Sequence, residues 1–336
     1  MTNQTIVVSK DGDADFTTLQ DAILSIDDNH VEQITILVKP GIYVEKVFIR
    51  KENIRIVGED CHTTIFRYND GAKTLRADGS EYGTFNTATI LFAGNNIEVE
   101  NITFENFAGI GRIAGQALAT YIASDRTSFY HCRFLGYQDT IFTADSTALH
   151  MERLILPEWF KNSSVPIEHP NTRIYFEDCY ICGDVDYIFG PSTAYFNHCE
   201  IFTRKLESEN DSFITAASTP SNQEYGYVFN ECYLTGDGRE NSVYLGRPWR
   251  DYAKTAFIKC HMENHIKPIG WHNWNKVNAE VTTSYVEFNN VGLGASPSQR
   301  ATFSKQLDNE GLLEYYSVKS VLADNDNWNP SRYNTL

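Results

Sequence analysis

Hydrophobic residues occur along most of this chain in short runs, which glycine, asparagine and aspartate separate. Runs rich in β-branched and aromatic residues are typical of strands, and the separating residues are typical of turns. The pattern therefore predicts strands at residues 6–8, 34–38, 47–49, 54–57, 89–92 and 97–104.

The helical pattern is confined to the two ends of the chain. Leu19, Ala22, Ile23 and Ile26 are spaced i, i+3, i+4 and i+7, as on one face of a helix. Thr18 lies three residues before Asp21 and resembles the start of a capping box. We therefore predict one short N-terminal helix, and a helical or irregular segment near residues 310–322.

The strand-like runs also repeat. Residues 132–142 and 179–189 both fit Cys-x-x-x-Gly-x-x-Asp-x-Ile-Phe, and an aromatic residue precedes a cysteine again at Cys199, Cys232 and Cys260. Such a repeat is typical of a parallel β-solenoid, in which each coil places the same position above its predecessor. The fold class is therefore all-β, with the cysteines buried as small hydrophobic residues.

The spacing of the repeats indicates a long excursion. Cys179 and Cys199 are 20 residues apart, which suits one coil, whereas Cys132 and Cys179 are 47 apart. If the latter coils are neighbours, about 27 residues leave the solenoid and return, and residues 145–172 fit that description. No linker divides the chain, so we predict a single domain over residues 1–336 that includes this excursion.

Composition and charge exclude several classes of function. The formal net charge is -16, and an acidic chain is poorly suited to nucleic acid or to an anionic membrane. No apolar stretch is long enough for a transmembrane helix. The N-terminus shows no export signal, so we expect a cytoplasmic protein, or a secreted or periplasmic one if a signal was removed. Seven cysteines form neither a dense disulfide framework nor a zinc motif, and we expect no metal.

The repeat places Asp139 and Asp186 at the same position of two coils. Two neighbouring carboxyl groups can divide acid–base work, with one ionised as a nucleophile and one protonated as a proton donor. Arg247 is a candidate to keep one of them charged, and Gln116 and Gln138 are candidate oxyanion donors. Alternatively, repeated aspartates merely cap turns, and from the repetition alone this second interpretation is favoured.

Six short segments, taken in their order along the chain, favour the catalytic interpretation of the two aspartates instead. They are Gly-Ile-Tyr-Val-Glu at 41–45, Gln-Ala-Leu-Ala at 116–119, Gly-Tyr-Gln-Asp-Thr at 136–140, Asp-Val-Asp-Tyr-Ile-Phe-Gly at 184–190, Leu-Gly-Arg-Pro-Trp at 245–249 and Gly-Trp-His-Asn-Trp at 270–274. With these segments the chain resembles the pectin methylesterase family over nearly its whole length.

The resemblance implies a right-handed parallel β-helix and hydrolysis of the methyl ester of galacturonate without a cofactor. It implies that Asp186 attacks the ester carbonyl and that Asp139 protonates the departing methanol and then activates water. Gln138 and Gln116 are expected to stabilise the oxyanion, and Arg247 to pair with Asp186. The substrate implied is pectin or a methylated oligogalacturonide, and we expect a monomer.

Aromatic residues of the same segments are expected to bind sugar rings. Trp249 and Phe189 are the main candidates, with Tyr137 and Trp271 beside them. For Trp271 a core position is an equally good interpretation, and Trp274 is expected to be a core or end-cap residue.

Three further residues have no assigned role. His261 and His265 are four apart, but the pattern around them is that of a strand and turn, so both are expected at the surface. Asp184 lies two residues before Asp186, where it is either exposed on the opposite strand face or perturbs Asp186.

Two features set the chain apart from the family it resembles. The excursion at 145–172 is longer than expected, and the lack of an export signal is unusual for an enzyme of polymeric pectin. Together these features suggest short methylated oligogalacturonides as substrates, and the acidic surface agrees, because it suits neutral methyl esters better than bare polygalacturonate. The alternatives are a polygalacturonase or pectate lyase on the same fold, a carbohydrate-binding β-helix without activity, and an esterase or thioesterase for another acyl group. No Gly-x-Ser-x-Gly segment is present, which argues against a serine hydrolase.

Overall fold

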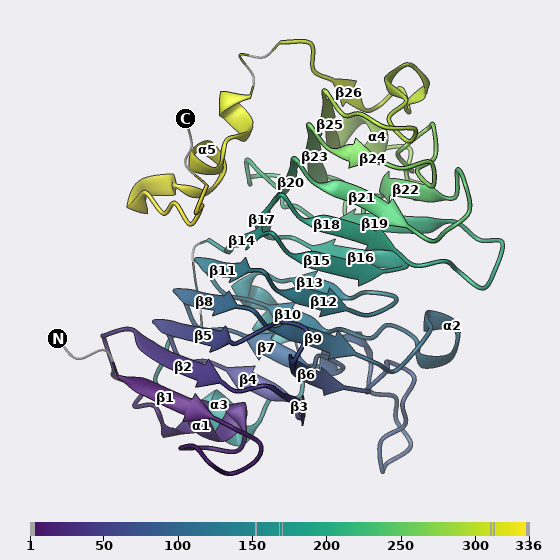
Figure 1. Cartoon of the computed structure of the whole chain (residues 1–336). Helices are drawn as coiled ribbons and strands as arrows, with labels where there is room; N and C mark the ends of the chain where they lie inside the picture. The colour runs from purple at the N-terminus through teal and green to yellow at the C-terminus, as the bar shows by residue number, and fades with distance from the viewer. Residues whose placement is uncertain are drawn as a thin grey trace. The chain divides into compact units, whose positions relative to one another are not determined.

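The computed structural model describes residues 4–151, 153–167, 169, 171–309, 311 and 313–333. The chain divides into two compact units, Met1–Thr172 (unit 1) and Arg173–Leu336 (unit 2). In both units the strands belong to three parallel sheets, A, B and C, so that each coil passes from sheet A to sheet B to sheet C (Figure 1). The fold is an all-β, right-handed parallel β-helix, as predicted, whereas the single domain stays a prediction.

Unit 1 contains the first coils of the solenoid. Sheet A is formed by β1 (Thr5–Val8), β2 (Ile34–Val38), β5 (Ile54–Gly58), β8 (Ile97–Glu100) and β11 (Thr127–Tyr130). Sheet B is formed by β3 (Gly41–Val44), β6 (Thr64–Tyr68), β9 (Thr103–Asn106) and β12 (Arg133–Leu135). Sheet C is formed by β4 (Val47–Ile49), β7 (Ile90–Phe92), β10 (Thr120–Ile122) and β13 (Ile141–Thr143). The helical elements are α1 (Leu19–Ser25), η1 (Thr84–Asn86), α2 (Gly111–Ala114), η2 (Ser146–His150) and α3 (Glu158–Asn162).

Unit 2 continues the pattern. Sheet A is formed by β14 (Arg173–Glu177), β17 (Thr193–Asn197), β20 (Tyr227–Asn230), β23 (Lys254–Ile258), β25 (Ser284–Phe288) and β26 (Lys305–Gln306). Sheet B is formed by β15 (Tyr180–Gly183), β18 (Glu200–Thr203), β21 (Tyr233–Gly236) and β24 (His261–Met262). Sheet C is formed by β16 (Val185–Gly190), β19 (Ser212–Ala217) and β22 (Val243–Gly246). The helical elements are α4 (Ala279–Thr282), η3 (Pro297–Gln299), η5 (Glu314–Tyr316), α5 (Val318–Leu322) and η6 (Asp324–Asp326).

The elements predicted at the ends of the chain are present. In α1, the Thr18 hydroxyl accepts a hydrogen bond from the Asp21 amide at 3.1 Å and donates one to its carboxylate at 2.7 Å. Near the C-terminus α5 packs against β17, and the Tyr195 hydroxyl donates to the Tyr316 carbonyl at 3.0 Å. Among the described residues, no helix is both long and apolar enough to cross a membrane.

Most predicted strands are confirmed, but the run at 97–104 forms two strands. Asn101, between β8 and β9, has a φ of 58°. A residue in this left-handed conformation turns the chain from sheet A into sheet B, and asparagine adopts it more readily than most residues. Hydrophobic pattern alone does not show such a one-residue corner.

The core of unit 2 consists of side-chain ladders. Phe176, Phe196, Phe229 and Phe257 occupy one register position of sheet A, and neighbouring rings stack with centroids 4.6, 4.4 and 4.5 Å apart. The residues paired between β14 and β17 are 20 positions apart, for example Arg173 with Thr193. The predicted coil length is therefore confirmed here.

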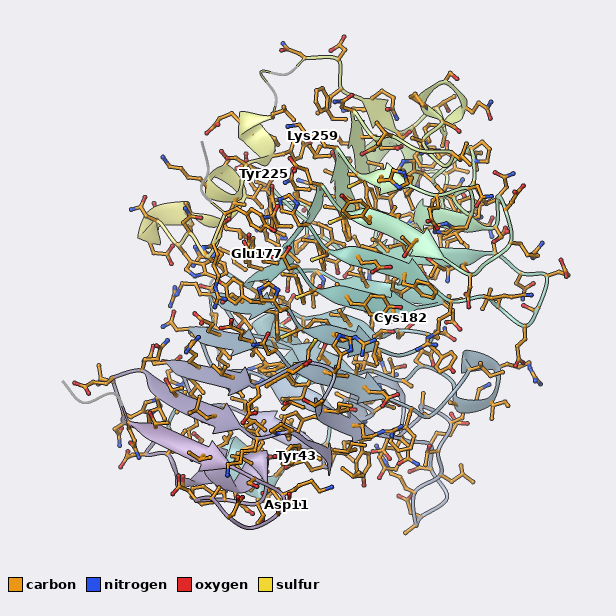
Figure 2. All side chains as sticks on the ribbon, in the orientation of Figure 1. Asp11, Tyr43, Glu177, Cys182, Tyr225 and Lys259 are labelled. Carbon is orange, nitrogen blue, oxygen red and sulfur yellow. The ribbon has the colours of Figure 1, made fainter. Side chains whose placement is uncertain are left out.

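Cysteines form a second ladder in unit 2, just after β17, β20 and β23. The thiols of Cys199, Cys232 and Cys260 each donate to a phenylalanine carbonyl of the preceding coil, at 3.5, 3.3 and 3.5 Å. All three are fully buried, and none of the seven cysteines forms a disulfide. Figure 2 shows side chains pointing both into and out of the coils, with Cys182 on β15.

The predicted excursion contains η2 and α3 and covers the outer face of sheet C in unit 1. Phe48, Tyr121 and Phe142 share that face by register. The Tyr121 hydroxyl donates to the Ala148 carbonyl at 3.0 Å, and the Phe48 ring lies 6.3 Å from that of Phe160. Phe85 of η1 also covers this face, with its ring 4.9 Å from that of Phe142, and β7, β10 and β13 are buried on both faces. Pro170, one of the prolines of this segment, lies outside the described residues.

Candidate active site

Asp186 lies on β16, at an irregularity of sheet C. The pairing of β16 with β19 shifts register between Val185 and Ile188, and Asp186 has a φ of 50°. A bulge of this kind turns a side chain away from the direction that strict alternation would give it. The side chain is nevertheless well covered, because Asp186 is only 6% exposed. A buried carboxylate held by an unusual backbone conformation is typical of functional sites.

Arg247 holds both carboxylate oxygens of Asp186. Its Nε lies 2.8 Å from Oδ1 and its Nη2 lies 2.6 Å from Oδ2. Paired, nearly parallel hydrogen bonds of this type fix the carboxylate plane as well as its charge. The predicted pairing of Arg247 with Asp186 is therefore confirmed.

The backbone of Arg247, at the end of β22, is held in place by β19. The Arg247 amide donates to the Thr215 carbonyl on β19 at 2.9 Å. At the preceding Gly246, a Cβ would lie only 2.1 Å from the Thr215 hydroxyl oxygen. A glycine is thus required here because the two strands approach too closely for any side chain.

Two aromatic rings contact the guanidinium of Arg247. The centroids of Phe213 and Trp274 each lie 3.8 Å from its Cζ. Both distances are well within the range of cation–π contacts. Phe213 in turn stacks on Tyr244 with ring centroids 5.1 Å apart. The arginine is therefore oriented by one ring on β19 of sheet C and by one ring in the loop between β24 and α4.

Burial and the ion pair act in opposite directions on the nucleophile candidate. Burial raises the pKa of Asp186 above its ordinary value, and the hydrogen bonds and positive charge of Arg247 offset only part of this rise. Nearby Asp184 is also buried, and its burial raises its pKa to about 6, with the Asp186 charge adding to the rise. Its carboxylate accepts a hydrogen bond from the Val185 amide at 2.7 Å. Asp184 therefore lies inside the protein rather than on an exposed strand face.

Asp139, the acid–base candidate, belongs to unit 1, between β12 and β13. It is 8% exposed and has a φ of 65°, as unusual as that of Asp186. The turn that contains it is tied together by the Thr140 hydroxyl, which donates to the Tyr137 carbonyl at 3.1 Å. At Gly136 a Cβ would lie 2.6 Å from that hydroxyl oxygen, so the turn has no room for a larger residue.

Gln116 and Gln138 lie on successive coils of unit 1. The Ala117 amide donates to the Gln138 carbonyl at 3.1 Å, and the Gln116 carbonyl accepts from the Ala72 amide at 2.8 Å. Both glutamine side chains are half-buried. The structure thus brings these two predicted residues together, with Gln138 directly before Asp139.

The aromatic candidates divide into two groups. Trp249 is half-buried, and its ring lies 5.6 Å from that of the largely buried Phe189, while Tyr137 is half-buried in unit 1. Their sugar-binding role stays a prediction.

Trp271 is different, because it is 1% exposed and stacks on Tyr285 at 4.1 Å. Its indole nitrogen also donates to Glu287 at 3.0 Å. A side chain so enclosed has no free face for a sugar, which corrects its prediction as a substrate-binding residue.

Neither of the two rings that contact Arg247 is predicted from the sequence to do so. Phe213 has no motif around it. Its position beside the site follows from the register of β16 and β19, in which it pairs with Val185, the residue before Asp186. Trp274 was expected in the core or an end cap, but it is half-buried at Arg247. The second tryptophan of the segment at 270–274 marks a residue of interest, but the sequence does not show that its side chain points towards Arg247.

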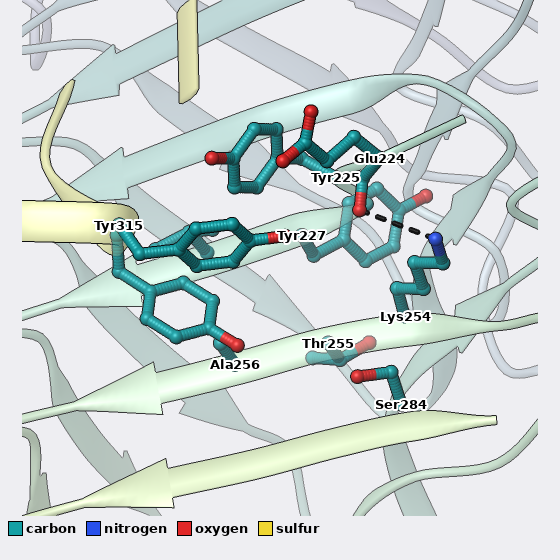
Figure 3. A pocket seen from close by; sticks show the side chains of 11 residues that line it. Glu224, Tyr225, Tyr227, Lys254, Thr255, Ala256, Ser284 and Tyr315 are labelled. Atoms are coloured by element: carbon teal, nitrogen blue, oxygen red, sulfur yellow. Dashed lines mark hydrogen bonds between the residues drawn. The ribbon is translucent and has the colours of Figure 1, made fainter. Parts of the chain in front are cut away.

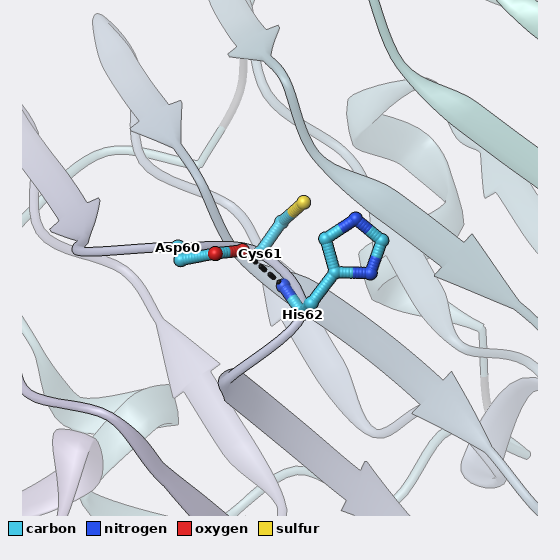
Figure 4. Close-up of side chains that lie close together, drawn as sticks. All are labelled: Asp60, Cys61 and His62. Atoms are coloured by element: carbon cyan, nitrogen blue, oxygen red, sulfur yellow. Dashed lines mark hydrogen bonds between the residues drawn. The ribbon is translucent and has the colours of Figure 1, made fainter.

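Two other clusters lie apart from these residues. Asp60, Cys61 and His62 form the one group among the described residues whose ligand atoms are close enough for a metal (Figure 4). They are consecutive in one turn, where the Asp60 carboxylate accepts from the His62 amide at 2.7 Å, so the cluster is explained by the turn itself. A pocket on sheet A of unit 2, lined by Tyr225, Lys254 and Tyr315 among others, includes none of the predicted site residues (Figure 3).

Comparison with known proteins decides the family. A family model described as Pectinesterase matches residues 5–155 and 168–325. The chain belongs to the pectinesterase family. Pectinesterase 31 of Arabidopsis thaliana is 35% identical over 94% of this chain and 92% of its own length.

Solved structures agree. A pectin methylesterase from carrot is 28% identical, with a TM-score of 0.80, over 96% of this chain and 94% of that one. A pectin methylesterase crystallised with a hexasaccharide is 27% identical, with a TM-score of 0.79, over 98% of this chain and 99% of that one.

Membership of the pectinesterase family makes this chain a carboxylic ester hydrolase, which removes the polygalacturonase and pectate lyase alternatives. The match covers every predicted catalytic residue but leaves out residues 156–167. That gap falls within the excursion, so the part of this pectinesterase that the family model leaves unmatched there includes α3 and its Phe160, but not η2.

Proposed function

We propose that this protein hydrolyses the methyl ester of galacturonate units in pectin or in methylated oligogalacturonides and releases methanol. The observation that carries the proposal is the buried, bidentate pair of Arg247 and Asp186 in a chain of the pectinesterase family. An ionised, oriented carboxylate is a nucleophile for an ester carbonyl. The hexasaccharide bound to a structural relative supports an oligosaccharide as the ligand.

The first half-reaction transfers the galacturonoyl group to the enzyme. A carboxylate oxygen of Asp186 forms a bond with the ester carbonyl carbon, and negative charge moves onto the carbonyl oxygen. The side-chain amides of Gln116 and Gln138 stabilise this oxyanion by donating hydrogen bonds. The bond to the methoxy oxygen then breaks, and that oxygen takes the proton of Asp139, so that methanol leaves and an acyl anhydride with Asp186 is formed.

The second half-reaction returns the enzyme to its starting state. Asp139, now ionised, removes a proton from a water molecule, whose oxygen attacks the same carbonyl carbon. The bond to Asp186 breaks and the Asp186 carboxylate is restored, paired again with Arg247. One ester and one water give one galacturonic acid and one methanol. Trp249, Phe189 and Tyr137 provide apolar faces for the sugar rings, and the enzyme acts as a monomer.

Methanol release tests the proposal directly. Purified protein is incubated with highly methylated pectin and, separately, with short methylated oligogalacturonides, and wild type is compared with Asp186→Asn. A matched control is Asp326→Asn, because Asp326 also forms a bidentate pair with an arginine, Arg173, at 2.8 and 2.6 Å. We expect release by wild type and by the control, and loss in Asp186→Asn.

Absence of release by well-folded wild type on both substrates would reject the proposal. The carbohydrate-binding and other-acyl-group alternatives would then be tested by binding of the same oligomers and by a panel of other esters. Release by Asp186→Asn at the wild-type rate would instead reject Asp186 as the nucleophile. Light scattering of the eluted protein measures whether it is a monomer.

A further inference from the structure

Trp274 lies in a turn that is costly to form. It has a φ of 54°, and the next residue, Asn275, has a φ of 56°. Two successive left-handed residues are unfavourable, and a bulky aromatic residue is a poor choice for that conformation. Strain of this kind persists only where the surroundings enforce it, and it is concentrated at functional sites.

The surroundings do enforce this turn. The Trp274 amide donates to Nδ1 of His272 at 2.8 Å, and the His272 amide donates to the Gly246 carbonyl at 3.1 Å. The Lys276 ammonium lies 5.3 Å from the Trp274 ring centroid and donates to the carbonyls of Pro248 and Trp249, both at 2.9 Å. The turn is therefore fastened on both sides to the segment that carries Arg247.

The indole ring of Trp274 contacts the guanidinium of Arg247. Its centroid is 3.8 Å from Cζ, as is that of Phe213, and the guanidinium donates to both oxygens of Asp186. An arginine side chain has several rotatable bonds, but the pair with Asp186 requires one orientation of its plane. Contact with aromatic faces selects that orientation and keeps water from competing for the donors.

We propose that Trp274 is a positioning residue, which holds the Arg247 guanidinium in the plane in which it binds both oxygens of the nucleophile. This inference rests on the proposed function, because Trp274 affects catalysis only if Asp186 is the nucleophile. Trp274 acts through the arginine and not through the substrate. Its removal lets the guanidinium turn away, so that Asp186 takes up a proton more readily.

The test is the pH dependence of kcat and KM for methanol release by Trp274→Ala and Trp274→Phe. In Trp274→Ala we expect the acidic limb of kcat/KM to move to higher pH, with a loss of about 2- to 30-fold on that limb, the range of one cation–π contact. The loss shrinks as the pH rises from that limb to the pH optimum, where Asp186 is ionised without help, and KM is unchanged. Trp274→Phe retains a ring and restores most of the wild-type profile.

A matched control is Trp328→Ala, since Trp328 lies 5.7 Å from the Cζ of Arg173, which pairs with Asp326. This variant removes a similar contact from another arginine–aspartate pair and should leave the profile unchanged. Thermal unfolding and circular dichroism confirm that each variant is folded.

Three outcomes overturn the inference. A uniform loss at every pH indicates only structural damage, and a higher KM at every pH indicates that Trp274 binds sugar. An unchanged profile shows that Arg247 needs no positioning by this ring. Failure of wild type to release methanol rejects the proposed function itself, and so is distinguishable from all three.

Discussion

Asp139 and Asp186 hold the same left-handed backbone conformation, with φ values of 65° and 50°. They occupy equivalent positions of the Cys-x-x-x-Gly-x-x-Asp-x-Ile-Phe repeat, one in each unit. The repeat therefore encodes a backbone geometry together with a carboxyl group. Glycine, asparagine and aspartate adopt that geometry more readily than most residues, which restricts what can replace either residue without strain.

Asparagine is for this reason the informative replacement at both positions. Asp139→Asn and Asp186→Asn keep the shape and the backbone preference, so we expect unfolding midpoints close to wild type. Asp186→Asn abolishes methanol release because an amide is not a nucleophile here. Asp139→Asn lowers kcat about 10²- to 10⁴-fold, the usual contribution of one general acid–base. Steady-state kinetics check both, and a folded Asp139→Asn enzyme with wild-type kcat would remove Asp139 from the mechanism.

Gly246→Ala tests the close approach of β22 and β19. The new methyl group would lie 2.1 Å from the Thr215 hydroxyl oxygen, so the strands must separate and Arg247 must shift. We expect a loss of stability of about 1–3 kcal/mol, as for other overpacked sites, and a lower kcat. Denaturant unfolding and methanol release measure the two effects.

Two companion variants sharpen this test. Thr215→Ala in the Gly246→Ala background removes the clashing oxygen and should recover part of both losses. Gly238→Ala is the neutral control, because its Cβ would meet nothing closer than the Ser242 hydroxyl oxygen at 3.6 Å. Equal stability of Gly246→Ala and wild type would mean that the strands are not held as closely as the structure shows.

Asp184 should make the protein less stable as the pH rises. Burial raises its pKa from 3.8 to about 6 in the folded state, so the folded protein binds a proton that the unfolded chain has released. The contribution of Asp184 to the free energy of unfolding is therefore intact below about pH 4. It falls by up to about 3 kcal/mol as the pH rises through 6. Asp184→Asn lacks this loss. Urea unfolding of both proteins at several pH values measures the difference, and parallel curves would contradict the assignment.

Arg50 anchors the excursion. Its side chain donates to the carbonyls of Val165 at 2.8 Å, Lys161 at 3.2 Å and Phe160. In Arg50→Met these carbonyls lose their donors, so we expect faster proteolysis within residues 156–167. If the excursion favours short substrates, as the sequence suggests, the variant gains activity on long pectin relative to oligomers.

The control for that experiment is Arg55→Met in the same unit. Arg55 pairs with Glu98 at 2.6 Å and Glu100 at 2.8 Å on sheet A, and so leaves the excursion in place. A wild-type substrate ratio in an Arg50→Met protein whose excursion is cleaved faster would show that this segment does not select substrate length.

Much of the fold could be predicted because coils repeat. Hydrophobic runs, the Thr18 cap and the 20-residue coil of unit 2 depend on local sequence or on its periodicity, and all are present. The pairing of Arg247 with Asp186 followed from the resemblance, and its geometry is confirmed. By contrast, the joint action of Asp139 and Asp186 stays a prediction, because the two residues belong to different units.

The errors occur where the chain turns. Trp271 and Trp274 are three residues apart, and the left-handed conformation of Trp274 breaks the alternation that would assign them to faces. His265 was expected at the surface but is 1% exposed, and burial lowers its pKa to about 4. It follows β24 in a turn packed near Gly236, where a Cβ would lie 3.3 Å from the imidazole. Turn geometry of this kind is set by packing between coils and not by local pattern.

The buried cysteines allow local unfolding of the solenoid to be followed by the labelling of their thiols. Cys61 is partly accessible, whereas the other six thiols are buried. A thiol-reactive dye should therefore label the native protein quickly at one site, and reach the others only when coils separate. The rate of that later labelling reports how often the solenoid comes apart, and mass spectrometry of the labelled peptides shows which coil opens first.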